Sequence, residues 1–207
     1  MKEMKLKSKK LAMFSIILTV FIGFGITLFA NNSVMNNKFT EIKTDYIETV
    51  QVDTISYQDS LKNELILAVD KYISKKSPKA NNSISASIVE HGLKNNIDIC
   101  FIMSQTQLET NFGAVGVGKE SSCRSLFGVI KKKYPSYDAA IEDYTRLLKK
   151  SYLVKGRDEH FLMKNYITGS GYRYAAAMDY EQKLSKIYKS ITKSTEIDEL
   201  QKLFDSI

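Results

Sequence analysis

An uninterrupted apolar run near the N-terminus constrains the topology of the whole chain. Residues 11–30 (LAMFSIILTVFIGFGITLFA) contain no charged side chain, and only Ser15, Thr19 and Thr27 are polar. At about 1.5 Å per helical residue, such a run reaches roughly 30 Å, the thickness of the hydrocarbon core of a bilayer. We therefore predict a transmembrane helix over residues 11–30.

The distribution of charge predicts the orientation of this helix. The chain has a net charge of +7, and residues 1–10, a basic tail with five lysines and one glutamate, supply +4 of it. Lysines keep the N-terminal end of a span in the cytoplasm, so the chain after residue 30 is expected outside it. A cleaved signal peptide is the alternative, although its apolar region usually has only about 7–15 residues. We expect a single-pass membrane protein with an extracytoplasmic C-terminal domain, secreted if the segment is cleaved.

The rest of the composition narrows the functional classes. Outside the basic tail the charge is nearly balanced, which argues against a nucleic-acid-binding surface. Two cysteines and two histidines leave little material for a metal site, so no metal or other cofactor is expected.

Downstream of the apolar run, the sequence indicates a spacer followed by one helical domain. Residues 31–56 are rich in Asn and Thr and lack a sustained helical period, although residues 46–52 are a candidate short strand. From residue 57 to residue 207, apolar residues recur at three- and four-residue steps, which is typical of amphipathic helices. Few segments alternate with period two, so the predicted class is mainly α. The helices are predicted between residues 61 and 77 and over residues 83–93, 99–110, 137–150 and 180–191.

One carboxylate stands out because of its place in the helix predicted over residues 99–110. Glu109 lies in the last turn and shares a face with Ile102 and Thr106. There it meets the negative end of the helix dipole, which disfavours its ionised form. Partial burial would raise its pKa further, and a carboxyl that keeps its proton near neutral pH can act as a general acid. Spacing alone also fits a solvated glutamate at a helix end.

Glu109 lies in the first of four sequence motifs that occur in the same order as in a known protein family. The run NNIDICFIMSQTQLETNFG and the following SLFGV resemble the glucosaminidase family of peptidoglycan hydrolases, of the autolysin and flagellar-muramidase type. YPSYDAAIEDY and GYRYAAAMDYEQKL resemble two further family motifs, so the resemblance extends over residues 57–192. The matching positions are Gln105, Leu108, Glu109, Thr110, Phe112, Gly113, Leu126, Phe127, Gly128, Tyr174, Ala175, Tyr180, Lys183 and Leu184.

This resemblance implies a lysozyme-like helical fold, no cofactor, and peptidoglycan glycan strands as the substrate. It gives Glu109 the role of general acid in cleavage of a β-1,4 glycosidic bond, and it places Tyr174 opposite Glu109 in the catalytic centre. The residues then expected to bind substrate are Phe127, Tyr172, Gln105 and Phe112.

The chain departs from the family pattern where a β-hairpin lobe usually carries a second carboxylate. Only residues 129–133 (VIKKK) separate the LFG motif from Tyr134, and they contain no acid. An inverting hydrolase needs two carboxyls roughly 6.5–9.5 Å apart. The candidates for a second carboxylate are Glu120, Asp158 and Glu159, which lie in predicted loops; the sequence does not place them relative to Glu109.

Three alternatives remain open at this point. A single glutamate suffices if the N-acetyl group of the substrate is the nucleophile, or if the enzyme is a lytic transglycosylase, in which the muramic acid 6-hydroxyl attacks. The third alternative is an inactive, membrane-anchored module that only binds glycan, because Ala177 and Met178 replace the usual Asp-Pro of the last motif.

The two cysteines carry a separate hypothesis. In an oxidising compartment Cys100 and Cys123 would be able to pair and tie the loop before the LFG motif to the helix of Glu109. The alternative is a buried free thiol at Cys100 and an exposed one at Cys123.

Overall fold

The computed structural model describes residues 33–81, 83–120, 124–128 and 132–207. The basic tail and the transmembrane helix predicted over residues 11–30 lie outside this part of the chain. Among the helices that are described, none combines the length and the apolar character needed to cross a bilayer.

The contacts divide the chain into two units, residues 1–51 and residues 52–207. The described part of the first unit is helical, because α2 (Ser33–Lys76) begins there. The sequence did not predict a helical backbone from residue 33 onward, and the candidate strand over residues 46–52 is part of this helix. A periodicity test detects apolar stripes, whereas this polar segment has none; it also contains no Pro or Gly that would end a helix.

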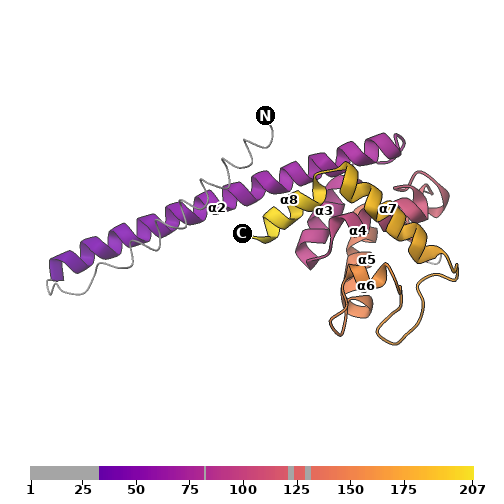
Figure 1. Ribbon diagram of the computed structural model, residues 1–207. Helices are drawn as coiled ribbons and strands as arrows, with labels where there is room; N and C mark the ends of the chain where they lie inside the picture. Colours follow the sequence, from indigo (N-terminus) through magenta and orange to yellow (C-terminus); the bar gives the residue numbers. More distant parts are fainter. Residues whose placement is uncertain (1–32, 82, 121–123, 129–131) are drawn as a thin grey trace. The chain divides into compact units, whose positions relative to one another are not determined.

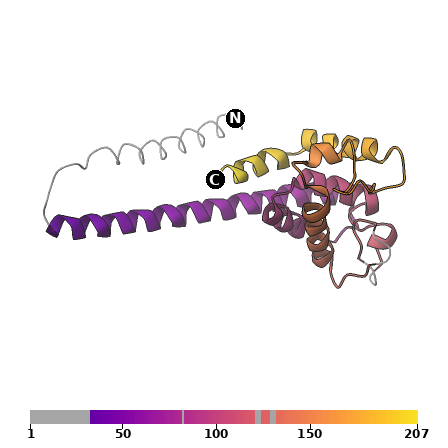
Figure 2. The same cartoon turned by 90° about the horizontal axis from the view of Figure 1, so that it is seen from below.

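The second unit is mainly helical, as predicted (Figure 1, Figure 2). Its described residues form no strand beyond one isolated antiparallel bridge between Ile167 and Arg173. The short helices η1 and α6 and the final helix α8 were not predicted. After α2, the elements are α3 (Ile84–Asn95), α4 (Ile99–Thr110), the 3-10 turn η1 (Gly116–Gly118), α5 (Tyr137–Leu147), the π-helical turn η2 (Leu148–Tyr152), α6 (Glu159–Leu162), α7 (Tyr180–Ser194) and α8 (Ile197–Asp205).

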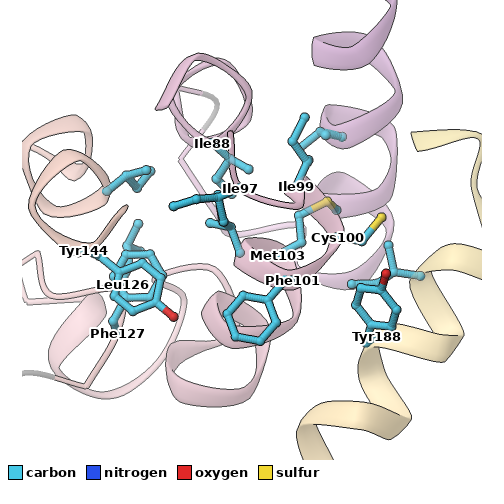
Figure 3. Close-up of a cluster of buried hydrophobic side chains, with 14 of the residues drawn as sticks. Ile88, Ile97, Ile99, Cys100, Phe101, Met103, Leu126, Phe127, Tyr144 and Tyr188 are labelled. Atoms are coloured by element: carbon cyan, nitrogen blue, oxygen red, sulfur yellow. The ribbon is translucent and has the colours of Figure 1, made fainter. Parts of the chain in front are cut away.

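Helix α4 is the central element of this unit, and it packs against α3, α7 and α8. Its first turn is capped by Asp98, whose carboxylate accepts a hydrogen bond from the Phe101 backbone N–H. The five residues from Ile99 to Met103 are fully buried, so the apolar half of α4 forms the centre of the core. Figure 3 shows this cluster, in which side chains of α4 lie among those of α3, α5, α7 and the loop at residues 126–127.

Helix α8 supplies hydrogen-bond partners for the backbone at the buried N-terminal end of α4. The Gln201 side chain accepts a hydrogen bond from the Ile99 N–H (2.8 Å) and donates one to the Ile97 carbonyl (3.1 Å). Ile97 and Ile99 are fully buried, so water cannot replace either bond. Gln201 thus pairs two backbone groups that would otherwise be orphans at the start of α4.

We predict that Gln201→Ala lowers the free energy of unfolding by roughly 2–4 kcal/mol, because each buried backbone group left unpaired costs about 1–3 kcal/mol. Urea denaturation of the purified protein measures this difference. The matched control is Glu199→Ala, an exposed position on the same helix, which should change stability by less than about 0.5 kcal/mol. Equal effects of the two substitutions would contradict the role assigned to Gln201.

Candidate active site

Glu109 lies in the last turn of α4, where the sequence predicted it. The helix ends at Thr110, and Asn111, Phe112 and Gly113 all adopt positive φ (47°, 57° and 77°). These left-handed residues reverse the chain direction sharply. The chain therefore leaves the helix axis directly after Thr110. The Glu109 side chain is left half-buried at that end.

One oxygen of the Glu109 carboxyl is held by a hydrogen-bonded chain. The Tyr180 hydroxyl, from the first turn of α7, donates to Glu109 Oε1 at 2.5 Å. Gln105, one turn before Glu109 on α4, donates from Nε2 to the Tyr180 hydroxyl and, at 3.5 Å, to the same Oε1. Because α4 and α7 pack closely and Gln105 is fully buried, this chain is shielded from water.

The other oxygen lies against a glycine. A Cβ atom placed on Gly128 would lie 2.5 Å from Glu109 Oε2, and Gly128 has a φ of +71°. Both the close approach and the left-handed backbone favour glycine at this position. The backbone of the LFG motif therefore packs directly against the Glu109 carboxyl.

Tyr174 holds this loop in place. Its hydroxyl donates to the Phe127 carbonyl at 2.8 Å, and its ring stacks on Tyr166 with centroids 4.4 Å apart and planes at 9°. Its centroid is 5.5 Å from that of Tyr180. The structure thus brings Tyr174 and Glu109 into one cluster, as the resemblance implied, and adds Tyr180 to it.

The surroundings of Glu109 favour its protonated form. Burial raises the pKa of Glu109, and the hydrogen bond from Tyr180 opposes this rise only in part. No ion pair within the described ranges involves Glu109. Burial and the nearby Glu109 charge raise the pKa values of Tyr174 and Tyr180, so both tyrosines remain neutral donors.

Three of the residues predicted to bind substrate lie in the interior. Gln105 and Phe112 are fully buried, and Phe127 is 4% exposed. The Phe127 ring stacks on Tyr144 (3.6 Å between centroids), and the Phe112 ring meets Tyr72 edge-on. A buried side chain cannot stack on a sugar ring. These three residues therefore pack beneath the site and do not line it.

Tyr172 is different, because its side chain is 75% exposed. It lies in the loop that leads to Tyr174, and its N–H donates to the Thr168 hydroxyl at 3.0 Å. Gly171, with a φ of 90°, makes the turn before it. Of the four residues predicted to bind substrate, only this aromatic ring is presented to solvent.

Two of the three loop acids, Asp158 and Glu159, lie far from Glu109. Glu159 accepts a hydrogen bond from the N–H of Asp98, the cap at the opposite end of α4. Eleven residues of helix separate Asp98 from Glu109, or roughly 16 Å. Asp158 is adjacent to Glu159 and caps α6, and Glu120 is exposed beyond η1. No hydrogen bond joins any of the three to the cluster around Glu109 in the part of the chain that is described.

Tyr180 was not among the site residues predicted from the sequence. Its place in the last family motif was recognised, but the residue was interpreted only as part of the apolar face of a helix. Its position at the start of the predicted helix was the sequence feature that could have indicated a site role. From the first turn of a helix, a tyrosine hydroxyl can extend beyond the helix end and contact another element.

The described residues contain no cluster of three or more His, Cys, Asp or Glu side chains that could hold a metal. His91 instead pairs with Asp138 at 2.9 Å. Cys100 is fully buried. Cys123 lies outside the described residues, so its pairing with Cys100 stays a prediction.

Comparison with models of known protein families identifies a match to more than half of the chain. The family model Glucosaminidase, described as mannosyl-glycoprotein endo-beta-N-acetylglucosaminidase, matches residues 85–193. This range contains Glu109, the loop with Gly128, and both tyrosines of the cluster. A search of the curated proteins found no match.

Proposed function

The chain belongs to the glucosaminidase family, and from this membership we propose that it is a peptidoglycan hydrolase with Glu109 as its general acid. The observation that carries the proposal is the half-buried Glu109 carboxyl, which is held by Tyr180 and forms no ion pair with any described residue. Such a carboxyl keeps its proton to higher pH than a solvated one.

In the first step, the Glu109 carboxyl gives its proton to the glycosidic oxygen as the bond from that oxygen to the anomeric carbon breaks. The leaving sugar departs as a neutral alcohol, and Glu109 becomes a carboxylate. The Tyr180 hydroxyl, already donating to Oε1, then stabilises the new negative charge. Proton transfer of this kind contributes about 10²- to 10⁴-fold to the rate.

For the second step, we propose that the N-acetyl carbonyl oxygen of the substrate attacks the anomeric carbon. This assignment needs no second carboxylate and agrees with the positions of Asp158 and Glu159 at the opposite end of α4. We assign the orientation of the N-acetyl group to Tyr174, whose hydroxyl donates to the Phe127 carbonyl and whose oxygen keeps a lone pair for the amide N–H. Water then opens the cyclic intermediate and returns a proton to Glu109.

A lytic transglycosylase is the second candidate, and the same observation favours it. Where no second carboxylate lies beside the acid, the muramic acid 6-hydroxyl is an equally suitable nucleophile. The two activities differ in what attacks the anomeric carbon and in which sugar carries that carbon, so their products separate them.

Solubilisation of purified peptidoglycan by the purified protein tests the proposed activity. We expect soluble glycan fragments and a falling turbidity. Tight binding to the glycan with no release of fragments would instead indicate a binding module. We further propose, from the sequence of residues 1–30 alone, that the domain acts outside the cytoplasm.

Tyr172 supplies a prediction on substrate binding. We expect Tyr172→Ala to raise KM about tenfold with little change in kcat, because stacking of a sugar on an exposed ring of this size contributes on the order of 1.4 kcal/mol. Tyr172→Phe keeps the ring and should behave as the unaltered protein. Steady-state kinetics on soluble glycan fragments measures both variants, and an unchanged KM in Tyr172→Ala would remove Tyr172 from the substrate site.

A further inference from the structure

The two oxygens of the Glu109 carboxyl have different environments. Oε1 faces the Tyr180 hydroxyl on α7, and Oε2 faces the bare backbone of Gly128. A carboxylic acid carries its proton on one oxygen at a time. The surroundings therefore decide which oxygen can deliver that proton.

The direction of the hydrogen bond between Tyr180 and Glu109 follows from Gln105. The Tyr180 oxygen accepts an N–H from Gln105 Nε2, so its own hydrogen points elsewhere. The Tyr174 hydroxyl also lies near Tyr180, but the hydrogen bond that meets normal geometry runs from Tyr180 to Glu109 Oε1, at 2.5 Å. A proton on Oε1 would point at the hydrogen of the tyrosine, so Oε1 is the acceptor in both the neutral and the ionised state.

We propose that Tyr180, fixed by Gln105, is a positioning residue that places the catalytic proton of Glu109 on Oε2, above Gly128. This inference rests on the proposed function, because it assigns the oxygen that protonates the substrate. The absence of a side chain at residue 128 lets the loop backbone approach that oxygen without a steric clash.

The opposite orientation of the Gln105 amide is less favourable. The Gln105 Oε1 atom is buried and has no hydrogen-bond partner in the described part of the chain. A flipped amide would place an NH2 group with two donors at that position, which leaves two polar hydrogens unpaired instead of one acceptor. It would also remove the contact from Gln105 Nε2 to Glu109.

Within the described part of the chain no ion pair reaches Glu109, and the first charged residues of α7 have other partners, since Glu181 pairs with Arg173 and Lys183 with Asp179. Tyr166 and Tyr174 lie in the segment before α7, and their pKa values are raised, by burial above all. Helix η1 has no titratable side chain, and α8 packs at the far end of α4, beside Ile97 and Ile99. The charged groups of α3 have other partners, in the pairs Lys62–Glu90, His91–Asp138 and Lys94–Glu142.

Tyr180→Phe tests the proposal through the pH dependence of kcat/KM. A donor to a carboxylate stabilises the ionised form, so its removal raises the pKa of Glu109 further above its ordinary value. Because the general acid must be protonated, activity falls as pH rises through this pKa. We therefore expect the alkaline limb of the profile to move to higher pH, together with about a tenfold loss of kcat at the optimum.

Tyr188→Phe is the matched control. It removes the same hydroxyl from the same helix, but that hydroxyl donates to Asp98 Oδ2 (2.6 Å) at the opposite end of α4. We expect it to lower stability while leaving the alkaline limb in place. A merely structural role for Tyr180 would give the same result in both variants.

The outcomes are distinct when the purified full-length chain is assayed on soluble glycan. An alkaline limb that moves to higher pH in Tyr180→Phe alone supports the proposal. An unmoved limb overturns it, and so does a limb that moves to lower pH, since Tyr180 would then accept the proton of Glu109. Failure of the proposed function itself would appear differently, as an unaltered protein without turnover.

Discussion

Glu109→Gln is expected to reduce glycan cleavage by roughly 10²- to 10⁴-fold, because the amide has the shape of the carboxyl but no acidic proton to give. The glutamine oxygen can still accept the hydrogen bond from Tyr180, so the packing of α4 against α7 should persist. We therefore expect a folded protein that still binds peptidoglycan. Release of soluble fragments, compared at equal protein concentration, measures the loss.

Glu199→Gln provides the matched control for this variant. It makes the same chemical change at an exposed position of α8. We expect full activity from it and similar thermal stability in both variants. If Glu109→Gln cleaved glycan as fast as Glu199→Gln, Glu109 would not be the general acid.

Gly128→Ala is expected to have the second largest effect, a loss of activity of roughly 10²-fold. The new methyl group would lie 2.5 Å from Glu109 Oε2, closer than real Cβ contacts allow, so either the loop or the carboxyl must move. A displacement of about 1 Å at a reacting group is enough for a loss of this size. Kinetics on soluble glycan fragments, together with the thermal midpoint, measures the change.

Gly156→Ala separates this clash from backbone strain. Gly156 has a φ of +73°, close to the +71° of Gly128, but no atom lies within 4 Å of a Cβ placed there. Both substitutions carry a left-handed penalty of about 1–2 kcal/mol, and only Gly128→Ala meets the carboxyl. Similar activity losses in the two variants would show that strain alone is responsible.

The sequence was sufficient for α4 and for the position of Glu109. The predicted helix and the observed one both cover residues 99–110, because an apolar run follows the capping Asp98 and a left-handed turn ends it at Asn111. Local signals of this kind act within a few residues. They are therefore visible without knowledge of the fold.

Contacts between distant residues were not visible in this way. Tyr180 lies 71 residues after Glu109, and Gln201 lies 102 residues after Ile99, so no periodicity relates these pairs. The motif positions of Phe112 and Phe127 were recognised, but motif identity does not distinguish a ring that lines a cleft from one that supports it. Burial decides that, and it depends on the packing of the whole unit.

The identity of the reducing end in the released muropeptides tests the proposed hydrolysis most directly. We predict that mass spectrometry of the products from purified peptidoglycan finds reducing N-acetylglucosamine, and that these products are absent with Glu109→Gln. Reducing N-acetylmuramic acid would assign cleavage to the other glycosidic bond. Terminal 1,6-anhydromuramic acid would contradict hydrolysis and identify the enzyme as a lytic transglycosylase.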